Sequence, residues 1–136
     1  MTHLLDTSAW LAHLFGEPGA EAVNLLFEDP QNVVHVSILS LPEMYGRLKA
    51  LDRQEQWPLV RDTYAGLFAK YLPVDEAIAA AAIELRGSTQ PRLPTIDALI
   101  AATATVHGLT LVHRDPHLAA IAGASLSQVS LPDKQI

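Results

Sequence analysis

Short apolar runs alternate with longer stretches of helical pattern along this chain, and that alternation constrains the fold more than any other feature. The runs at 4–5, 33–37 and 109–112 have the leucine-rich or β-branched character of buried strands. Weaker strand candidates lie at 72–74 and 126–129. The helices that separate them are expected at 9–15, 18–28, 40–52, 55–71, 75–86 and 96–107, with a short one after 115. Strands that alternate with helices predict an α/β fold with a parallel sheet and helices on both faces.

Length and composition predict one domain, expected to span 1–136, and exclude several classes of protein. With 49% hydrophobic residues the chain can bury a core and is not disordered. No run approaches the ~20 apolar residues of a membrane span and no signal pattern is present, so we expect a cytoplasmic protein with no membrane partner. The absence of cysteine excludes disulfides and thiolate metal sites. A net charge of −6 argues against a protein that coats nucleic acid, but not against a nuclease whose bound cations supply positive charge.

Four acidic residues lie at or just before the start of an expected helix, and three of them lie where a strand leads into that helix. Asp6 follows the first strand, Glu43 lies in the first turn of the helix after the second strand, and Asp115 follows a later strand. Asp97 lies in the first turn of the helix at 96–107, which is apolar nearly all round and therefore buried. Because the carboxyl ends of parallel strands lie at one edge of a sheet, we expect these carboxylates to converge.

Each acid taken alone also has a structural explanation. Asp6 and Asp115 could cap the N-termini of helices. Glu43 could complete a capping box with the expected N-cap Ser40, and Asp97 could simply interact with its helix dipole. Taken together, however, crowded and unpaired carboxylates repel one another. A hard divalent cation, Mg²⁺ or Mn²⁺, relieves that repulsion and prefers oxygen ligands, and such ions can activate a water for displacement at a phosphodiester.

At these residues the chain resembles the PIN-domain family, and within it the VapC-type ribonuclease toxins of toxin–antitoxin pairs. The resemblance rests on Asp6-Thr7-Ser8 after the first strand, on the Glu43 helix, on the stretch LPTIDALIAATA at 93–104 and on Arg114-Asp115. The stretch around Asp97 is the most specific of these motifs. The resemblance spans essentially the whole chain.

The resemblance implies a single PIN-like domain, a three-layer α/β/α sandwich with a central, mainly parallel sheet. It implies a Mg²⁺- or Mn²⁺-dependent endoribonuclease that is the toxin of a type II toxin–antitoxin system. The residues that it implies as metal ligands and catalytic groups are Asp6, Glu43, Asp97 and Asp115. The expected partners are an RNA substrate, a second copy of the chain in a homodimer, and a cognate antitoxin whose C-terminal segment covers the site in a hetero-oligomer.

One residue departs from the PIN pattern. PIN proteins often carry threonine or serine two residues before the fourth acid, and here that position is His113. A histidine there could contact a phosphate or shift the water network. The hydroxyl groups of Thr7 and Ser8, beside the first acid, are further candidates to orient a ligand, and one of the two is expected to cap the helix at 9–15.

Arginines near the acids are candidates for contacts to an RNA phosphate. Arg86 and Arg92 precede the last long helix, and Arg114 lies beside the fourth acid. The alternative is that all three are solvated surface charges. Arg47 follows Glu43 by one helical turn, which predicts an intrahelical ion pair.

Other classes of protein fit the residues less well. A haloacid-dehalogenase-type phosphatase needs a second acid two residues after the first, where this chain has Ser8, and a receiver domain needs a lysine after its late strand. His113 and His117 lack the spacing of a recognised zinc motif. The remaining alternative is a catalytically silent PIN-like protein that acts only as a binding partner. Metal-dependent cleavage of RNA would separate that protein from a ribonuclease.

Overall fold

Five parallel strands form the central sheet of the computed structural model, which describes residues 1–88, 93–121 and 126–132. The strands are β1 (Thr2–Leu5), β2 (Val33–Ser37), β3 (Tyr71–Leu72), β4 (Thr110–His113) and β5 (Gln128–Ser130). Their order across the sheet is β3-β2-β1-β4-β5, and every neighbouring pair is parallel. The predicted parallel α/β fold is therefore confirmed.

Helices separate the strands as predicted, although several of their ends differ from the predicted ranges. They are α1 (Thr7–Phe15), α2 (Ala20–Glu28), α3 (Ser40–Ala50), α4 (Trp57–Ala65), α5 (Glu76–Ser88), α6 (Thr95–His107) and α7 (Pro116–Ala119), with a 3₁₀ turn at Gln54–Gln56. The helix expected at 55–71 is shorter, because its segment begins with that turn and ends in β3. The sequence also predicts a loop at 87–94. The structure instead continues α5 through Ser88, and residues 89–92 lie outside the described residues. None of the described helices has the length and apolar character needed to cross a membrane.

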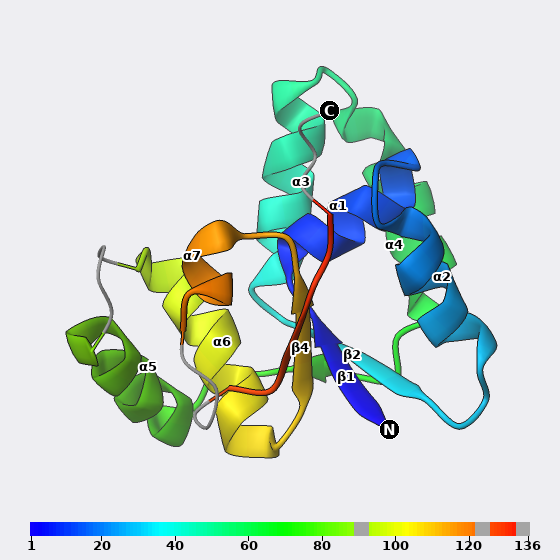
Figure 1. Ribbon diagram of the computed structural model, residues 1–136. Helices are drawn as coiled ribbons and strands as arrows, with labels where there is room; N and C mark the ends of the chain where they lie inside the picture. Colours follow the sequence, from blue (N-terminus) through cyan, green and yellow to red (C-terminus); the bar gives the residue numbers. More distant parts are fainter. Residues whose placement is uncertain (89–92, 122–125, 133–136) are drawn as a thin grey trace.

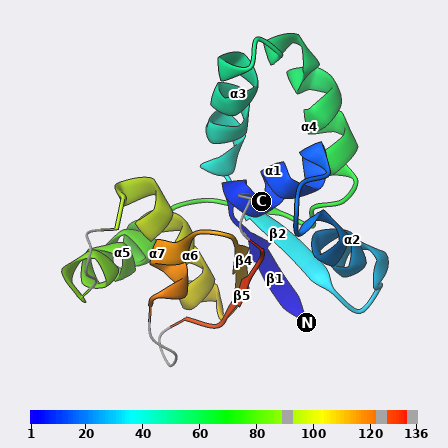
Figure 2. The same cartoon turned by 45° about the horizontal axis from the view of Figure 1, so that its top comes forward.

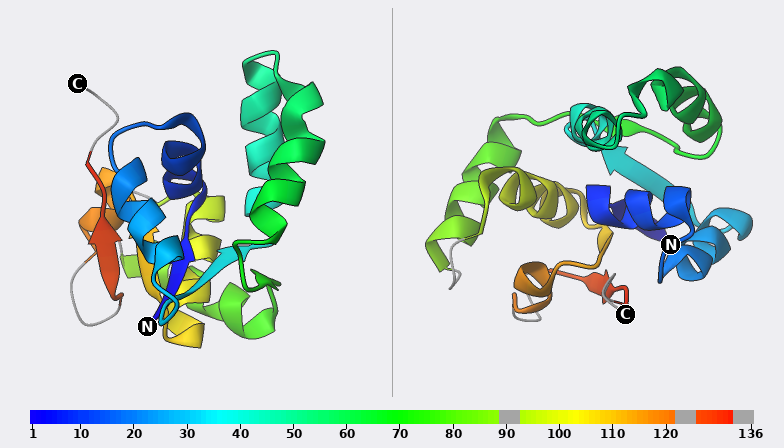
Figure 3. Two further views of the ribbon diagram at one scale, coloured as in Figure 1. Left: turned by 90° about the vertical axis from the view of Figure 1, so that its right-hand side faces the viewer. Right: turned by 90° about the horizontal axis from the view of Figure 1, so that it is seen from above.

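The helices cover both faces of the sheet, which gives three layers (Figure 1). On one face Leu4 of β1 shares an apolar core with Ile78 of α5. On the other face Leu5 packs in a second core with Trp10 of α1 and Met44 of α3. Neighbouring residues of β1 enter different cores because side chains alternate across a strand. Seen from above, α5 and α6 lie on one side of the strands and α1 and α2 on the other (Figure 3).

The helices α3 and α4 extend as a pair beyond the carboxyl edge of the sheet (Figure 2). An aromatic cluster holds the base of this pair against α1. Trp10 is fully buried, and its ring centroid lies 6.3 Å from that of Trp57, 5.3 Å from Tyr64 and 5.1 Å from Phe68. Truncation of such a ring to alanine typically costs about 3–5 kcal/mol. The cluster therefore fixes the position of α4 relative to α1.

Strand register brings residues that are distant in sequence to one edge of the sheet. Leu5 is the register partner of both Val36 in β2 and Val112 in β4. Asp6 continues the pairing, since its backbone N–H donates to the Val112 carbonyl at 3.0 Å. The residues that follow β1, β2 and β4 therefore meet at the carboxyl edge of the sheet.

Gly19 gives a test of how Leu131, which follows β5, packs against the start of α2. It has a left-handed backbone (φ 97°), and a β-carbon there would lie 3.0 Å from the Cβ of Leu131. We expect Gly19→Ala to lower the free energy of unfolding by at least about 1–2 kcal/mol, the usual cost of a left-handed residue. Urea unfolding measures the change.

Gly87→Ala is the matched control for this variant. Gly87 lies within α5, and nothing approaches within 4 Å of an added β-carbon. Alanine should therefore leave the stability unchanged or raise it by about 0.5–1 kcal/mol. Equal effects of the two substitutions would contradict the packing described for Gly19.

Candidate functional site

A cavity of about 510 Å³ lies at the carboxyl edge of the sheet. Its wall contains all four acids that the sequence singled out, together with hydroxyl and cationic side chains. The residues that line it are Asp6, Thr7, Ser8, Leu11, Glu43, Gly46, Arg47, Asp97, Arg114, Asp115 and Pro116. The fold thus brings the four acids together from separate parts of the chain.

Asp6 both caps a helix and lines the cavity. It is buried directly after β1, and its Oδ1 accepts hydrogen bonds from the Ala9 N–H at 2.8 Å and the Ser8 hydroxyl at 2.6 Å. Asp6 is therefore the N-cap of α1, and the prediction that Thr7 or Ser8 caps this helix is wrong. The two hydrogen bonds fix the orientation of the carboxylate.

Glu43 is held by a hydroxyl group rather than by a capping box. It lies in the first turn of α3, and its Oε1 accepts a hydrogen bond from the Thr7 hydroxyl at 2.6 Å. Thr7 Oγ1 also lies 3.0 Å from the Oγ of Ser40. Ser40 is the first residue of α3 and makes no capping hydrogen bond, so the predicted Ser40 cap is wrong. Thr7 therefore links α1 to the acid of α3.

Asp115 repeats the arrangement of Asp6 at the end of β4. It is the N-cap of α7, and its Oδ1 accepts a hydrogen bond from the His117 N–H at 2.8 Å. Asp97 lies in the first turn of α6, and after burial the charge of the neighbouring Asp115 is the largest influence that raises its pKa. Capping and a shared acidic site were alternative explanations for these residues. For Asp6 and Asp115 the structure shows both at once.

Burial and mutual repulsion raise the pKa of two of the acids. The pKa of Asp6 rises from 3.8 to about 6, chiefly because burial disfavours the charged form. The charges of Asp115 and Glu43 raise it further, while the hydrogen bonds that Asp6 accepts lower it. The pKa of Asp97 also rises to about 6, first through burial and then through the other three acids. At neutral pH the folded protein therefore holds carboxylates that repel one another.

The acids surround the cavity without forming a closed metal centre. Within the described residues, no three acidic, histidine or cysteine side chains form a ready-made ligand set. The donor chemistry nevertheless fits a hard divalent cation, because such ions prefer carboxylate oxygens. The charge of a cation would also offset the repulsion that raises the pKa of Asp6 and Asp97. These acids, with Glu43 and Asp115, are the residues that could hold such an ion.

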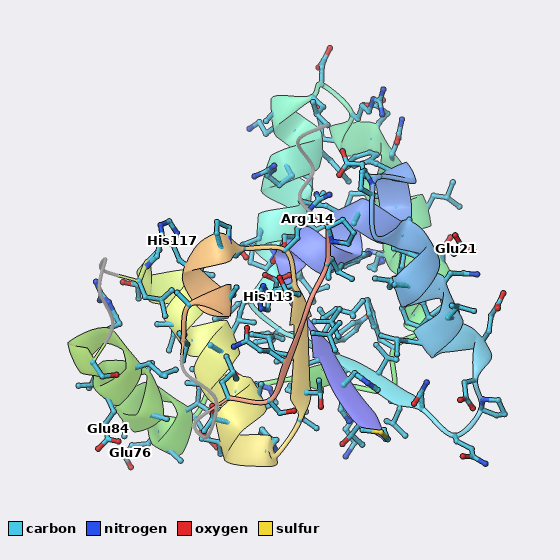
Figure 4. The ribbon with its side chains drawn as sticks, in the orientation of Figure 1. Glu21, Glu76, Glu84, His113, Arg114 and His117 are labelled. Carbon is cyan, nitrogen blue, oxygen red and sulfur yellow. The ribbon has the colours of Figure 1, made fainter. Side chains whose placement is uncertain are left out.

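Ser8 and Arg114 connect the end of β4 to Asp6. The Ser8 hydroxyl donates to Asp6 and accepts a hydrogen bond from the Arg114 N–H at 3.2 Å. The Arg114 side chain is nearly buried, and its Nη2 lies 2.7 Å from Oε1 of Glu17. Figure 4 shows Arg114 beside α1, above the end of β4. The Arg114 guanidinium group therefore lines the acidic cavity, whereas its ion-pair partner Glu17 does not.

The residues predicted to contact substrate differ in their placement. Thr7, Ser8 and Arg114 line the cavity, and the two hydroxyl groups already hold acids in place. His113 does not line it, because the side chain is fully buried at the end of β4. In this structure His113 is therefore not in a position to touch a bound phosphate.

The remaining arginines have other surroundings. Arg86 Nε donates to the Leu93 carbonyl at 3.1 Å, outside the cavity wall, and so braces the segment before α6. Arg92 lies outside the described residues. Arg47 lines the cavity, and among the described residues it forms no ion pair with Glu43. The predicted intrahelical pair is thus not observed.

Several residues of the site were missed from the sequence. Leu11 lies one helical turn after Thr7, and Gly46 lies three residues after Glu43, so helical spacing could have found both. Glu17 is separated from Arg114 by 97 residues. No local pattern could have identified that ion pair.

Comparison with known proteins agrees with the fold described above. The family model of the PIN domain matches residues 3–124 of the chain. No curated protein matches it closely enough to count as a relative. VapBC2 from Rickettsia felis, solved bound to a DNA fragment from its promoter, is 19% identical with a TM-score of 0.78, over 96% of this chain and 98% of that chain.

Two structures from Mycobacterium tuberculosis have the same fold. VapBC-5, a member of the VapBC family of toxin–antitoxin systems, is 25% identical with a TM-score of 0.70, over 95% of this chain and 98% of that chain. VapC20, a sarcin–ricin loop cleaving toxin, is 18% identical with a TM-score of 0.70, over 93% of this chain and 99% of that chain.

Asp97 allows a direct test of carboxylate crowding. In chelator at pH 7.5, Asp97→Asn should raise the melting temperature by a few degrees, because it removes a carboxylate whose charged form is disfavoured. The raised pKa fixes the sign of the pH dependence. Since the folded state binds the proton more tightly, stability falls as the pH rises from 3.8 through about 6. The advantage of the variant should therefore vanish near the lower end of that range in thermal melts.

Glu76→Gln is the matched control. Glu76 lies in the first turn of α5, exposed and far from the cavity (Figure 4). Its replacement should lower the stability by about 0.3–1 kcal/mol through loss of a helix-dipole interaction. If Asp97→Asn is destabilised in the same way at pH 7.5, Asp97 is only a helix-end residue.

Proposed function

Because this chain belongs to the PIN-domain family, we propose that it is a Mg²⁺- or Mn²⁺-dependent endoribonuclease and the toxin of a type II toxin–antitoxin pair. One observation carries the proposal. Four carboxylates line a single cavity, and their environment raises the pKa of two of them to about 6. Such crowding costs stability at neutral pH unless a cation binds there.

The proposed metal ligands are Asp6, Glu43, Asp97 and Asp115. These oxygens would hold a hard divalent ion, and the chemistry that it would supply when bound is activation of a water and stabilisation of the negative charge on the phosphate. The chain itself supplies the geometry, since the acids lie at the N-termini of four different helices around one cavity. Preorganised charged groups of this kind lower the barrier because they need little rearrangement during reaction.

Two hydroxyl groups have supporting roles in this proposal. The Thr7 hydroxyl donates to Glu43 and the Ser8 hydroxyl donates to Asp6, so each orients one proposed ligand. Neither hydroxyl carries a charge that would compete with a cation. The acids are thus held in place while their negative charge is retained.

RNA fits the cationic part of the same wall. Arg47 and Arg114 line the cavity beside the acids, and guanidinium groups form strong hydrogen bonds to phosphate oxygens. The net charge of −6 disfavours nucleic acid over most of the surface, so binding would depend on these local cations. VapC20, a sarcin–ricin loop cleaving toxin with the same fold, supports this substrate class.

The first test of the function is removal of one proposed ligand. With purified protein, a labelled RNA and saturating Mn²⁺, Asp6→Asn should slow cleavage by about 10²–10³-fold, the usual cost of losing one stabilising group from a transition state. Chelator should abolish cleavage by the unchanged protein. Gel analysis of the RNA products measures both effects.

Asp62→Asn is the control for charge removal. Asp62 is an exposed acid on α4 that pairs with Arg61 at 3.2 Å, away from the cavity. Its replacement should leave the cleavage rate unchanged. Cleavage by Asp6→Asn at the rate of the unchanged protein would remove Asp6 from the site, and a lack of metal-dependent cleavage by any form would favour the silent binding protein.

A second cavity supports the proposal of an antitoxin partner. It has a volume of about 590 Å³ and is lined by Leu11, Phe15, Glu17, Arg47, Ala50, Leu51, Arg53 and Arg114. Three of these residues, Leu11, Arg47 and Arg114, also line the acidic cavity, so the two cavities adjoin. A peptide with apolar anchors could lie there and reach the acids with a cationic side chain. VapBC-5, which belongs to a family of toxin–antitoxin systems, supports a partner of this kind.

Co-expression tests the partner directly. The chain and the product of the adjacent gene should migrate together on a sizing column, and the complex should cleave no RNA. The mass of the chain alone on the same column reports whether it forms the proposed homodimer. Independent migration of the two proteins, each with unchanged activity, would contradict the antitoxin proposal.

A further inference from the structure

His113 is buried beside the site but does not line it. The side chain has no exposed surface, and it lies at the end of β4, below Arg114 (Figure 4). The two residues that follow it, Arg114 and Asp115, both line the acidic cavity. An effect of His113 on the site must therefore act through its neighbours.

Both ring nitrogens of His113 are engaged, and their partners define the protonation of the ring. The backbone N–H of Asp115 donates to Nδ1 at 3.0 Å, so Nδ1 carries no hydrogen. The Nε2–H then donates to Oε1 of Gln128 in β5, at 2.6 Å. The Gln128 amide is itself fixed, since its Nε2 donates to the Ile121 carbonyl at 3.1 Å. The imidazole is thus anchored on the edge strand and directs Nδ1 at the backbone of Asp115.

The bond from Asp115 N–H to His113 spans two residues, which is the pattern of a side chain that closes a turn. Serine, threonine, asparagine and aspartate commonly make this bond to the N–H two residues later. Here an imidazole makes it instead. A second bond holds the same turn, because the Arg114 N–H donates to Ser8. The turn fixes the direction in which the chain leaves β4, and therefore where the Asp115 carboxylate lies.

We propose that His113 is a positioning residue for Asp115: its imidazole closes the turn between β4 and α7 and so holds the Asp115 carboxylate in the wall of the acidic cavity. The inference rests on the proposed metal-binding role of Asp115. His113 contacts neither substrate nor cation in this role. The anchor on Gln128 explains why the ring is buried instead of facing the cavity.

Two substitutions separate the hydrogen bond from the volume of the ring. His113→Thr removes the ring but keeps an oxygen that can accept from the Asp115 N–H. His113→Phe keeps a ring of similar size but has no acceptor. Mn²⁺ affinity is measured for each variant from the rise of the melting temperature with added MnCl₂. Asp115→Asn serves as the reference for loss of the ligand. Leu111→Ala, at a core position of β4, serves as the control for loss of stability alone.

The proposal predicts that Mn²⁺ affinity follows the acceptor and not the ring. His113→Phe should bind Mn²⁺ about 10–100-fold more weakly, the usual effect of losing a group that orients a metal ligand. His113→Thr should stay close to the unchanged protein even if its melting temperature in chelator falls. Leu111→Ala should be less stable but should keep its Mn²⁺ affinity.

Other outcomes overturn the proposal or its premise. Unchanged affinity in His113→Phe, or equal losses in His113→Thr and His113→Phe, would show that His113 does not position Asp115. If the unchanged protein gains no stability from Mn²⁺, metal binding itself fails and the inference fails with it. If Asp115→Asn keeps the full gain in stability that Mn²⁺ gives the unchanged protein, Asp115 is not one of the metal ligands.

A measurement on the unchanged protein keeps the test valid if a variant does not fold. Long-range ¹H–¹⁵N NMR spectra distinguish the two neutral forms of a histidine ring. His113 should show the proton on Nε2 and none on Nδ1. A proton on Nδ1 would be incompatible with the bond from Asp115 and would overturn the proposal.

Discussion

The concentration of negative charge at one edge of a parallel sheet is the constraint on which the rest of the site depends. Strand register sets Asp6 beside the end of β4, and α3 and α6 add Glu43 and Asp97 to the same cavity. Burial increases the cost of each charge, because less water solvates it and its neighbours repel it more strongly. The raised pKa of Asp6 and Asp97 reflects that cost. Because these charges lower the stability of the fold, a functional role that requires negative charge explains the cluster better than a structural role does.

Neutral groups, rather than cations, hold these acids in place. Thr7 donates to Glu43, Ser8 donates to Asp6, and the His113 ring closes the turn that carries Asp115. An arginine in the same position would also fix a carboxylate, but it would supply the positive charge that a metal ion is proposed to supply. The nearby Arg114 is instead paired with Glu17. The site therefore combines fixed geometry with uncompensated charge, which is the combination that cation binding requires.

Local patterns predicted the parallel fold and the four acids, because strand and helix periodicity and the position after a strand are properties of short segments. Side-chain partners were not predictable in this way. The Thr7–Glu43 bond spans 36 residues, and the Arg114–Glu17 pair spans 97. Such pairs depend on which faces of packed helices meet, and that is decided by the tertiary fold. The predicted cap of the first helix was wrong for a simpler reason: α1 begins at Thr7, two residues earlier than the expected start at residue 9, which makes Asp6 the cap instead of Thr7 or Ser8.

Helix N-termini explain how the fold tolerates the acids. Asp6 and Asp115 cap α1 and α7, while Glu43 and Asp97 lie in the first turns of α3 and α6. Each acid thus lies where unpaired backbone N–H groups carry partial positive charge, and there a carboxylate is favoured by about 0.3–1 kcal/mol. That contribution is too small to cancel burial and repulsion, since Asp6 and Asp97 keep a raised pKa. It nevertheless offsets part of that cost, so the capping interactions are compatible with a metal site at the same residues.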